Sequence, residues 1–468
     1  MQGRKVLRFT VFVTDFIFLA LGYLFFFYFR VTTGWFDLIL QPDFLLPMLI
    51  VNFYWLFIFN FVGMYKHVFA PSRFDELSEL FKVTFVGIFI LFFLIFFDDY
   101  SHGVESTSRV IIFYYWGFLL AFVGAGRLVV RSMQRNLLIK GVGTKKGIVV
   151  GCTQKAVDVY KDINAHPALG VRIAGFIDVE NQDKGNLLEG VPVLGSVQDI
   201  EQVIIDHHIE EVIIALEQHH DSVIVDIIGR CETYDVGMKM VPEMYEILSG
   251  QARTSQLYGI PLIDINPEPM KDWEKNTKRL MDMVFSTIML LLSLPVIVLT
   301  AIAIKLDSKG SVFFTQDRVG LRGKIFRIVK FRSMYIDAEA KTGPVWSTKD
   351  DPRVTRVGRF IRKVRIDEIP QVFNVLKGEM SMIGPRPERP YFVDLLSQEI
   401  PYYKRRLRVR PGITGWAQVR HKYDETLDDV KGKIRYDLFY IENMSLRMDF
   451  KILLRTVFVV SLGRGHFE

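Results

Sequence analysis

The chain has 468 residues and a formal net charge of +6, and half of its residues are hydrophobic, with 39 phenylalanines among them. Soluble domains rarely carry so much apolar residue, so the composition indicates a membrane component. A basic excess in a membrane protein usually lies in cytoplasmic loops, where it faces anionic lipid or phosphate ligands. The charge comes without a basic helix or an RNA-reading motif, so nucleic-acid binding is not expected.

Long apolar runs occupy the first part of the chain, at Phe9–Phe29, Phe44–Tyr65, Leu80–Phe97 and Val110–Gly126. Each is close to the roughly 20 residues that cross about 30 Å of hydrocarbon. Basic residues precede the first run and follow the second and the fourth, whereas the other two loops are acidic. The positive-inside rule therefore places both ends of this unit in the cytoplasm. We expect residues 1–140 to form a four-helix transmembrane scaffold with no chemistry of its own.

A fifth apolar run, residues 280–304, has basic clusters at both ends. A helix that crossed the bilayer would leave one of these clusters outside. Pro295 lacks a backbone donor and favours a kink, and the Ser293 hydroxyl can satisfy a freed carbonyl. The run is therefore predicted to be a broken, re-entrant helix that dips into the bilayer and returns to the cytoplasm. A plain spanning helix is the alternative.

Residues 141–268 show strand-like segments that alternate with helical stretches, at Gly147–Gly151, Val171–Asp178, Glu211–Ala215 and Gly237–Val241. This alternation predicts a cytoplasmic α/β domain with a parallel, Rossmann-like sheet. The turn after the first strand contains one glycine, so close approach to a pyrophosphate is not indicated. We interpret the domain as a regulatory or assembly module with no assigned ligand. Its Cys152 and the other cysteine, Cys231, do not have the spacing of a zinc site.

The polar residues most suggestive of chemistry follow Leu306. Asp367 and Glu368 are adjacent carboxylates in a strongly basic segment. On a helix, neighbouring side chains point about 100° apart, so the pair can share one metal ion or divide two roles. Nearby arginines keep the carboxylates ionised, and an ionised aspartate is a competent nucleophile toward phosphorus. Attack on a diphosphate requires neutralisation of its charge, which Mg²⁺ and basic side chains provide.

Arg386 lies between Pro385 and Pro387. A rigid turn of this kind presents one guanidinium, which binds phosphate oxygens bidentately. Taken alone, an Asp-Glu pair in a basic helix is a solvated salt-bridged face, and a Pro-Arg-Pro segment is an ordinary loop. Their clustering beside a membrane helix, where an amphiphilic acceptor would arrive, favours a functional site.

From Lys278 to the end, the chain resembles the bacterial sugar transferase family of polyprenyl-phosphate hexose-1-phosphate transferases, of the undecaprenyl-phosphate glucose/galactose type. The segments that carry the resemblance are 316–320, 328–334, 358–371, 374–387 and 410–418. One departure is Arg365-Ile366 before the carboxylate pair, where many relatives have Ser-Leu. The layout resembles the large form of these enzymes. It implies a mostly α-helical catalytic domain at 269–468 that includes the re-entrant helix.

The resemblance implies a covalent two-step mechanism. Asp367 attacks the sugar-linked phosphate of a UDP-sugar, UMP leaves, and undecaprenyl phosphate then attacks the phospho-sugar intermediate. Both carboxylates are candidate Mg²⁺ ligands, and Glu368 helps to hold the metal or orients the phosphate. The implied phosphate- and nucleotide-binding residues are Lys330, Arg332, Arg362, Arg386, Arg410 and Gln418.

The same resemblance places the protein in a bacterial inner membrane as a multi-pass protein that initiates exopolysaccharide, capsule or O-antigen synthesis. Its partners are then a UDP-sugar, undecaprenyl phosphate and the lipid bilayer, and a homodimer is compatible with the sequence. The Glu425-Thr426 pair slightly favours the glucose subgroup over the galactose subgroup.

The sequence argues against two other functions. A membrane-anchored nucleotide-sugar dehydratase or epimerase needs a Gly-rich loop and a Tyr-x-x-x-Lys pair in the middle domain, and neither occurs there. The intact Asp367-Glu368 pair argues against an inactive assembly or regulatory protein.

Overall fold

The computed structural model describes residues 2–33, 44–66, 73–102, 111–179, 185–217, 221–232, 234, 236–242, 255–257, 260–265, 269–336, 338, 351–400, 402–420 and 427–461.

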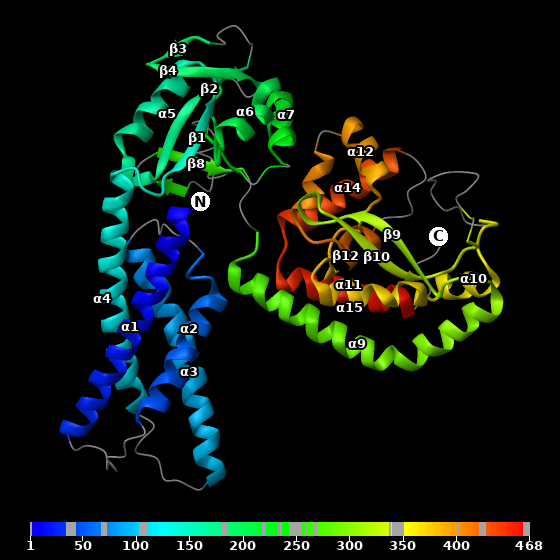
Figure 1. Cartoon of the computed structure of the whole chain (residues 1–468), viewed down its shortest axis with the longest axis horizontal. Helices are drawn as coiled ribbons and strands as arrows, with labels where there is room; N and C mark the ends of the chain where they lie inside the picture. The colour runs from blue at the N-terminus through cyan, green and yellow to red at the C-terminus, as the bar shows by residue number, and fades with distance from the viewer. Residues whose placement is uncertain are drawn as a thin grey trace. The chain divides into compact units, whose positions relative to one another are not determined.

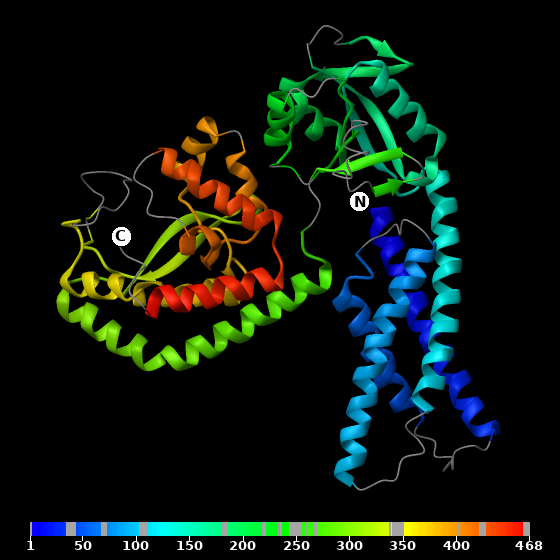
Figure 2. The ribbon, with the colours of Figure 1, turned by 180° about the vertical axis from the view of Figure 1, so that it is seen from behind.

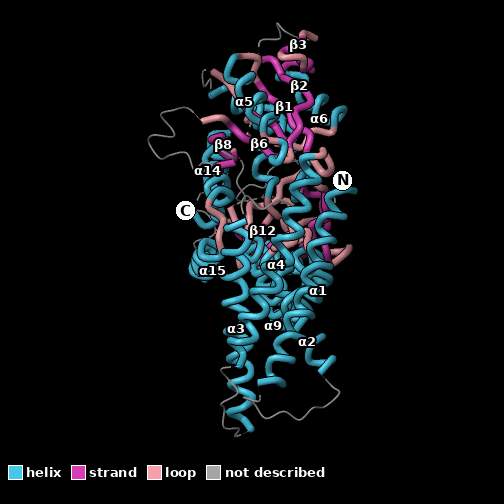
Figure 3. Tube along the Cα trace, turned by 90° about the vertical axis from the view of Figure 1, so that its left-hand side faces the viewer, coloured by secondary structure: helices cyan, strands magenta, loops and turns pink. Residues whose placement is uncertain are grey.

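The N-terminal part is helical (Figures 1 and 3), with helices α1 (Gln2–Thr33), α2 (Leu45–Val62), α3 (Arg73–His102) and α4 (Ile111–Ile139). This confirms the predicted helices, and all four are long and apolar enough to cross a membrane. Their core is aromatic, and the indole nitrogen of buried Trp55 donates to the Tyr115 hydroxyl at 2.9 Å. Many outward-facing side chains are large and apolar. Such a surface suits contact with lipid.

A buried ion cluster joins three of these helices and was not foreseen from the sequence. Arg127 of α4 is 1% exposed. Its guanidinium binds both carboxylate oxygens of Asp15 at 3.1 and 2.6 Å and one of Glu76 at 3.0 Å. Arg131 donates to Glu76 at 3.0 Å, and the Tyr65 hydroxyl donates to Asp15 at 2.9 Å. An unpaired charge at membrane depth is costly, so this mutual pairing lets the helices carry charge and holds α1, α3 and α4 together.

The middle part is an α/β sheet domain whose strands run in the order β3-β4-β2-β1-β5-β6-β8-β7. The strands are β1 (Lys145–Val150), β2 (Val171–Asp178), β3 (Leu187–Leu188), β4 (Val191–Ser196), β5 (Glu211–Ile214), β6 (Gly237–Met240), β7 (Ser255–Leu257) and β8 (Ile260–Asp264). The helices are α5 (Gln154–Ala165), η3 (Pro167–Leu169), η4 (Val197–Asp199), α6 (Ile200–His207) and α7 (Asp221–Cys231). The central strands are joined by helices, as a parallel sheet requires, and the pairs β3–β4, β6–β8 and β7–β8 are antiparallel. The predicted strands are confirmed to within two residues at each end.

Helix α9 (Asp272–Asp307) has 36 residues and includes Pro295. The predicted break is therefore wrong: Figures 1 and 2 show one bowed helix, with its concave side toward α10 and α11. Pro295 cannot donate to the carbonyl of Leu291. The Ser293 hydroxyl donates to the carbonyl of Leu290 at 3.3 Å rather than to this freed carbonyl. One missing hydrogen bond bends an apolar helix without ending it.

The two faces of α9 are inverted relative to those of an ordinary surface helix. Its buried side chains are mostly polar and recur at helical spacing, namely Asp282, Ser286, Ser293, Thr300 and Ile304. Its exposed face is apolar, and Leu292 and Leu306 are 75% and 84% exposed. A surface helix of a soluble protein turns its apolar face to the core and its polar face to water, which is the opposite arrangement.

Both ends of α9 are fixed to the C-terminal part of the chain. Near the start, Asp282 accepts from the Ser381 hydroxyl at 2.7 Å and from the Met382 amide at 3.0 Å. Near the end, Asp307 accepts from the Val357 amide at 3.0 Å, and Ile304 packs in a core cluster with Phe331 and Ile361.

The other elements of the C-terminal part are short helices and two small strand pairs among the described residues. Strands β9 (Phe313–Val319) and β10 (Ile325–Phe331) form an antiparallel pair, and β11 (Ser381–Ile383) runs parallel to β12 (Gly412–Thr414). The helices are η5 (Leu321–Gly323), α10 (Arg356–Lys363), η6 (Ile366–Gln371), α11 (Val372–Lys377), α12 (Pro390–Glu399), η7 (Tyr403–Arg408), α13 (Trp416–Arg420), α14 (Leu427–Glu442) and α15 (Leu446–Ser461).

Candidate active site

Asp367 and Glu368 lie in the first turn of η6, immediately after a sharp change of chain direction. Arg365, the residue before η6, has φ 60° and ψ 17°. A non-glycine residue in this left-handed region is uncommon and often marks a functional site. Because η6 is a 3₁₀ helix, the two carboxylates point about 120° apart rather than the expected 100°. Each residue is 8% exposed.

Glu368 collects the basic side chains of the site. Its Oε1 accepts from Arg386 at 2.6 Å and from Lys330 of β10 at 3.2 Å, and Arg365 approaches it to 3.9 Å. Burial by itself raises the pKa of Glu368, but Arg386, Lys330 and Arg365 together hold this pKa well below its usual range. Glu368 is therefore an ionised anchor that aligns Arg386 and Lys330.

Asp367 has the opposite environment. Its Oδ1 is buried and has no hydrogen-bond partner among the described residues. Burial, together with the charge of Glu368, raises the pKa of Asp367 to about 6, against the opposing effect of Lys330 and Arg362. A buried polar atom without a partner is rare in native structures, and a perturbed carboxylate in such a place is a functional candidate. This oxygen is therefore the functional candidate of the pair.

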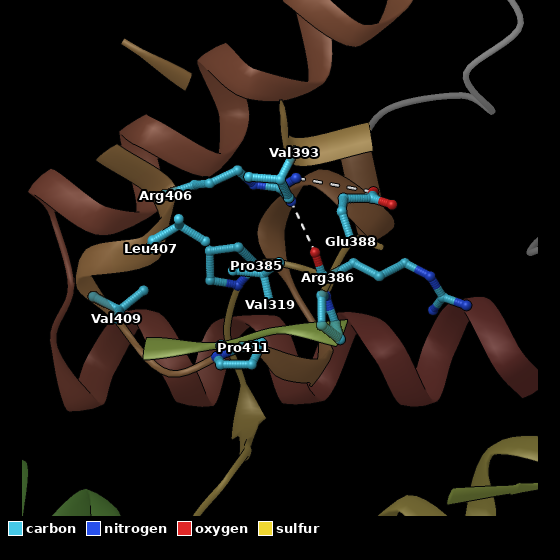
Figure 4. A pocket seen from close by; sticks show the side chains of 11 residues that line it. Val319, Pro385, Arg386, Glu388, Val393, Arg406, Leu407, Val409 and Pro411 are labelled. Atoms are coloured by element: carbon cyan, nitrogen blue, oxygen red, sulfur yellow. Dashed lines mark hydrogen bonds and ion pairs between the residues drawn. The ribbon is translucent and has the colours of Figure 1, made fainter. Parts of the chain in front are cut away.

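The Pro385–Pro387 segment that presents Arg386 is held by its backbone. The Arg386 carbonyl accepts from Arg406 at 2.8 Å, and the Pro387 carbonyl accepts from Arg318 at 3.0 Å. Figure 4 shows the Arg386 side chain pointing away from Arg406, so Arg386 is held by Arg406 at its carbonyl and by Glu368 at its guanidinium. The rigid turn expected from the flanking prolines is thus reinforced by two arginines, of which Arg406 is buried.

Arg406 belongs to a buried polar network that the sequence did not reveal. Its guanidinium donates to Asp437 at 2.9 Å and to the Tyr403 hydroxyl at 2.8 Å. Next to it, Glu388 accepts from Lys433 at 3.0 Å. Burial alone would raise the pKa of Glu388, but Lys433, Arg406 and Arg318 lower it to about 2. These residues are scattered along the chain and match no short motif, so only the fold brings them together.

Some of the predicted site residues lie together around the carboxylate pair, and the others bind other parts of the chain. Glu368 binds Lys330 and Arg386 directly. Asp367 is its neighbour in η6, and the charges of Lys330 and Arg362 act on it.

The other three predicted binding residues have partners elsewhere. Arg332 donates to the carbonyls of Ser308 and Lys309, at the end of α9. Arg410 donates to the carbonyl of Gly378 at 3.0 Å. Gln418 donates to the carbonyl of Ile413 at 3.2 Å. The sugar-subgroup pair Glu425-Thr426 lies outside the described residues.

The carboxylate pair fits a magnesium ion only together with a substrate. Among the described residues, no group of three metal-ligating side chains occurs. Mg²⁺ commonly binds one or two carboxylates and completes its octahedron with water and substrate phosphates. The unpartnered Oδ1 of Asp367 suits such a role, whereas Oε1 of Glu368 is already shared by Lys330 and Arg386.

Comparison with known proteins identifies two families. The bacterial sugar transferase family matches residues 273–463, and a CoA-binding domain family matches residues 60–242. The UDP-glucose:undecaprenyl-phosphate glucose-1-phosphate transferase of Xanthomonas campestris pv. campestris is 31% identical over 81% of this chain and 80% of its own length. The enzyme with that same name from Escherichia coli (strain K12) is 34% identical over 73% of this chain and 74% of its own length.

A third relative shares more identity over a shorter stretch. It is the UDP-N-acetylgalactosamine-undecaprenyl-phosphate N-acetylgalactosaminephosphotransferase of Aeromonas hydrophila. Identity is 44% over 238 residues, which make up 51% of this chain and 55% of that protein.

Proposed function

Because this chain belongs to the bacterial sugar transferase family and is a UDP-sugar:undecaprenyl-phosphate sugar-1-phosphate transferase, we propose that Asp367 carries its reaction as a covalent nucleophile. The observation that supports this role is the contrast within the carboxylate pair. Glu368 is engaged by two cations, whereas Oδ1 of Asp367 is buried without a partner among the described residues. Transfer of the sugar phosphate starts polysaccharide synthesis, and we place it at the cytoplasmic side of a bacterial inner membrane.

In the first step, Oδ1 of Asp367 attacks the phosphorus that bears the sugar. The phosphoanhydride bond breaks, and UMP leaves with the bridging oxygen and its electron pair. An acyl phosphodiester between Asp367 and the sugar remains. Lys330 and Arg386, which Glu368 aligns, bind the oxygens of the diphosphate and offset the negative charge that otherwise repels the carboxylate.

In the second step, a phosphate oxygen of undecaprenyl phosphate attacks the same phosphorus. The bond to Asp367 breaks, the carboxylate is regenerated, and undecaprenyl diphosphate sugar is released. A Mg²⁺ ion would be held by Asp367 and Glu368 together with the substrate, and it would offset the negative charge of the diphosphate. Two displacements predict overall retention of configuration at the phosphorus and no change at the anomeric carbon.

We further propose that α9 enters the cytoplasmic leaflet and returns, as the sequence suggested, although as a bowed helix rather than a broken one. Its 36 residues extend about 54 Å, which exceeds the hydrocarbon thickness. Its apolar face is outward, and both of its ends bind the C-terminal part of the chain. A helix that crossed the bilayer would have one end on the far side. A cysteine placed at Lys309 should therefore react with a membrane-impermeant reagent only from the cytoplasmic side, and labelling from outside would refute this placement.

The donor sugar has two candidates. The Xanthomonas and Escherichia relatives are named for UDP-glucose, which the sequence slightly favours over UDP-galactose, whereas the relative with more identity is named for UDP-N-acetylgalactosamine. A panel of UDP-glucose, UDP-galactose and both UDP-N-acetylhexosamines in one assay decides between them.

The nucleophile proposal is tested by trapping. Protein in nanodiscs without acceptor is mixed with a donor labelled with ³²P at the sugar-linked phosphate, then denatured. We expect label on the wild-type protein and release of UMP, and no label on Asp367→Asn. The matched control, Asp317→Asn, changes an exposed carboxylate that pairs with Arg327, and it should label normally. Label on Asp367→Asn at the wild-type level, or UDP as the released nucleotide, would overturn the proposal.

A further inference from the structure

Helix α15 presents an apolar stripe to its surroundings. Phe450, Leu454, Val457 and Phe458 are all more than half exposed. Their spacing of four, three and one places them on one face of the helix. Lys451 and Arg455 lie one turn apart on the flank of this stripe. An apolar face bordered by basic residues is the pattern of a helix that lies in a membrane interface.

Basic side chains of α15 and of the neighbouring α13 lie over one indole ring, that of Trp416. The guanidinium carbons of Arg420 and Arg455 lie 4.9 and 5.3 Å from the centre of the Trp416 ring, and Nζ of Lys451 lies 5.4 Å from it. Phe439 stacks near the same ring, and Trp416 itself is 7% exposed. We call Trp416, Arg420, Lys451 and Arg455 the tryptophan cluster.

The three positive charges of the tryptophan cluster repel one another, and no ion pair joins any of them to a carboxylate among the described residues. The ring attracts each cation through its quadrupole but cannot neutralise it. Arginines stacked on a ring keep their N–H edges free for oxygen acceptors. Such an arrangement is complementary to an anion that arrives from outside, and phosphate is an oxyanion that arginine binds bidentately and lysine binds as a point charge.

The position of the cluster identifies the source of that phosphate. In Figures 1 and 2, α15 lies alongside α9. Asp449 in the first turn of α15 accepts from Lys278 of α9 at 2.6 Å, and the Tyr440 hydroxyl donates to Asp449 at 2.7 Å. The helix that carries the apolar stripe thus lies beside α9, whose exposed face is also apolar. Indole rings and basic side chains are concentrated at the level of lipid headgroups.

We propose that the tryptophan cluster is a binding site for the phosphate of an anionic membrane phospholipid, and that the apolar stripe of α15 lies in the acyl boundary beside it. The site is separate from the carboxylate pair and does not depend on catalysis. The tryptophan cluster adds a contact with a specific lipid headgroup to the apolar contact that α9 is proposed to make with lipid. Basic residues at an anionic surface are each attracted to it, and this attraction is weakened by salt.

The test uses the full chain in nanodiscs and lipids brominated on the acyl chain near the headgroup, which quench nearby indoles. Trp416 is isolated as the difference between wild type and Trp416→Phe. We expect brominated phosphatidylglycerol to quench this component about threefold more than brominated phosphatidylcholine at equal content, and high salt to remove the difference.

Two variants with equal charge change complete the design. Arg420→Gln/Lys451→Gln/Arg455→Gln should abolish the preference for phosphatidylglycerol. Lys161→Gln/Lys324→Gln/Arg327→Gln, which alters exposed basic residues elsewhere, should keep it. Equal quenching by the two lipids in the wild type would overturn the proposal by showing apolar contact alone, and absence of quenching would overturn the membrane placement of α15. The wild-type salt dependence decides the matter even if the triple variant does not fold.

Discussion

Arg386 donates to Oε1 of Glu368 at 2.6 Å, which makes the glutamate of the pair a support for the arginine that we propose to bind phosphate. The aspartate beside it has no such attachment at Oδ1 within the described part of the chain. Two neighbouring carboxylates are thus given different tasks by their surroundings.

For turnover, the several N–H donors of the Arg386 guanidinium should matter more than its positive charge. Arg386→Lys keeps one positive charge but cannot bind Glu368 and a phosphate oxygen with separate N–H groups at the same time. We expect kcat/KM for the UDP-sugar to fall by about 10- to 100-fold, measured as UMP release. Arg327→Lys, a change at an exposed arginine, is the control. An unchanged rate would show that Arg386 does not touch the donor.

Arg406 is expected to act as a positioning residue for Arg386. Arg406→Lys keeps the charge near Asp437 but cannot reach Tyr403, Asp437 and the Arg386 carbonyl together. Loss of these buried hydrogen bonds should lower the free energy of unfolding by about 1–3 kcal/mol. Because the donor site shifts with the Arg386 backbone, KM for the UDP-sugar should rise more than kcat falls. Thermal unfolding and steady-state kinetics measure both effects, and a stability loss with unchanged KM would reduce Arg406 to a purely structural residue.

The low pKa of Glu388 links stability to pH. The pKa of Glu388 is about 2 in the folded protein and 4.5 ordinarily. The ionised carboxylate therefore stabilises the fold fully above about pH 4.5, and this stabilisation is lost as the pH falls toward 2. The shift corresponds to about 3 kcal/mol at neutral pH. In detergent, wild type should therefore unfold at a higher temperature than Glu388→Gln at neutral pH, and the gap should narrow as the solution is acidified. A gap independent of pH would contradict the ion-pair explanation.

Removal of divalent metal should stop turnover without unfolding the protein. Within the described residues, no group of three metal-ligating side chains provides a structural site, so EDTA should leave the melting temperature unchanged. UMP release should cease and return on addition of Mg²⁺. Undiminished turnover in EDTA would remove the metal from the mechanism.

Hydropathy and local motifs were sufficient to predict the membrane helices, the strands of the middle domain and the carboxylate pair, because each is encoded in a short stretch of sequence. Arg332 shows where local reasoning ends. Two residues after Lys330, it would share a face with that lysine in a continuing strand. However, β10 ends at Phe331, and the Arg332 side chain binds the end of α9 instead.

Tertiary contacts account for the other differences. Lys278 matches the basic flank of a membrane segment, and no local pattern indicates that it pairs with Asp449, 171 residues later. The same holds for Arg406 and Asp437. Pro295 was expected to break its helix, but the long apolar helix tolerates one absent donor and bends.

The attachment of α9 at both ends has one more consequence. Asp282 and Asp307 bind backbone amides of the same stretch of chain that carries Asp367. With α9 in the lipid as proposed, the immersion depth of the nucleophile is fixed by residues 272–461 alone. Shortening or replacing the N-terminal helices would then leave the distance between Asp367 and the headgroup plane unaltered.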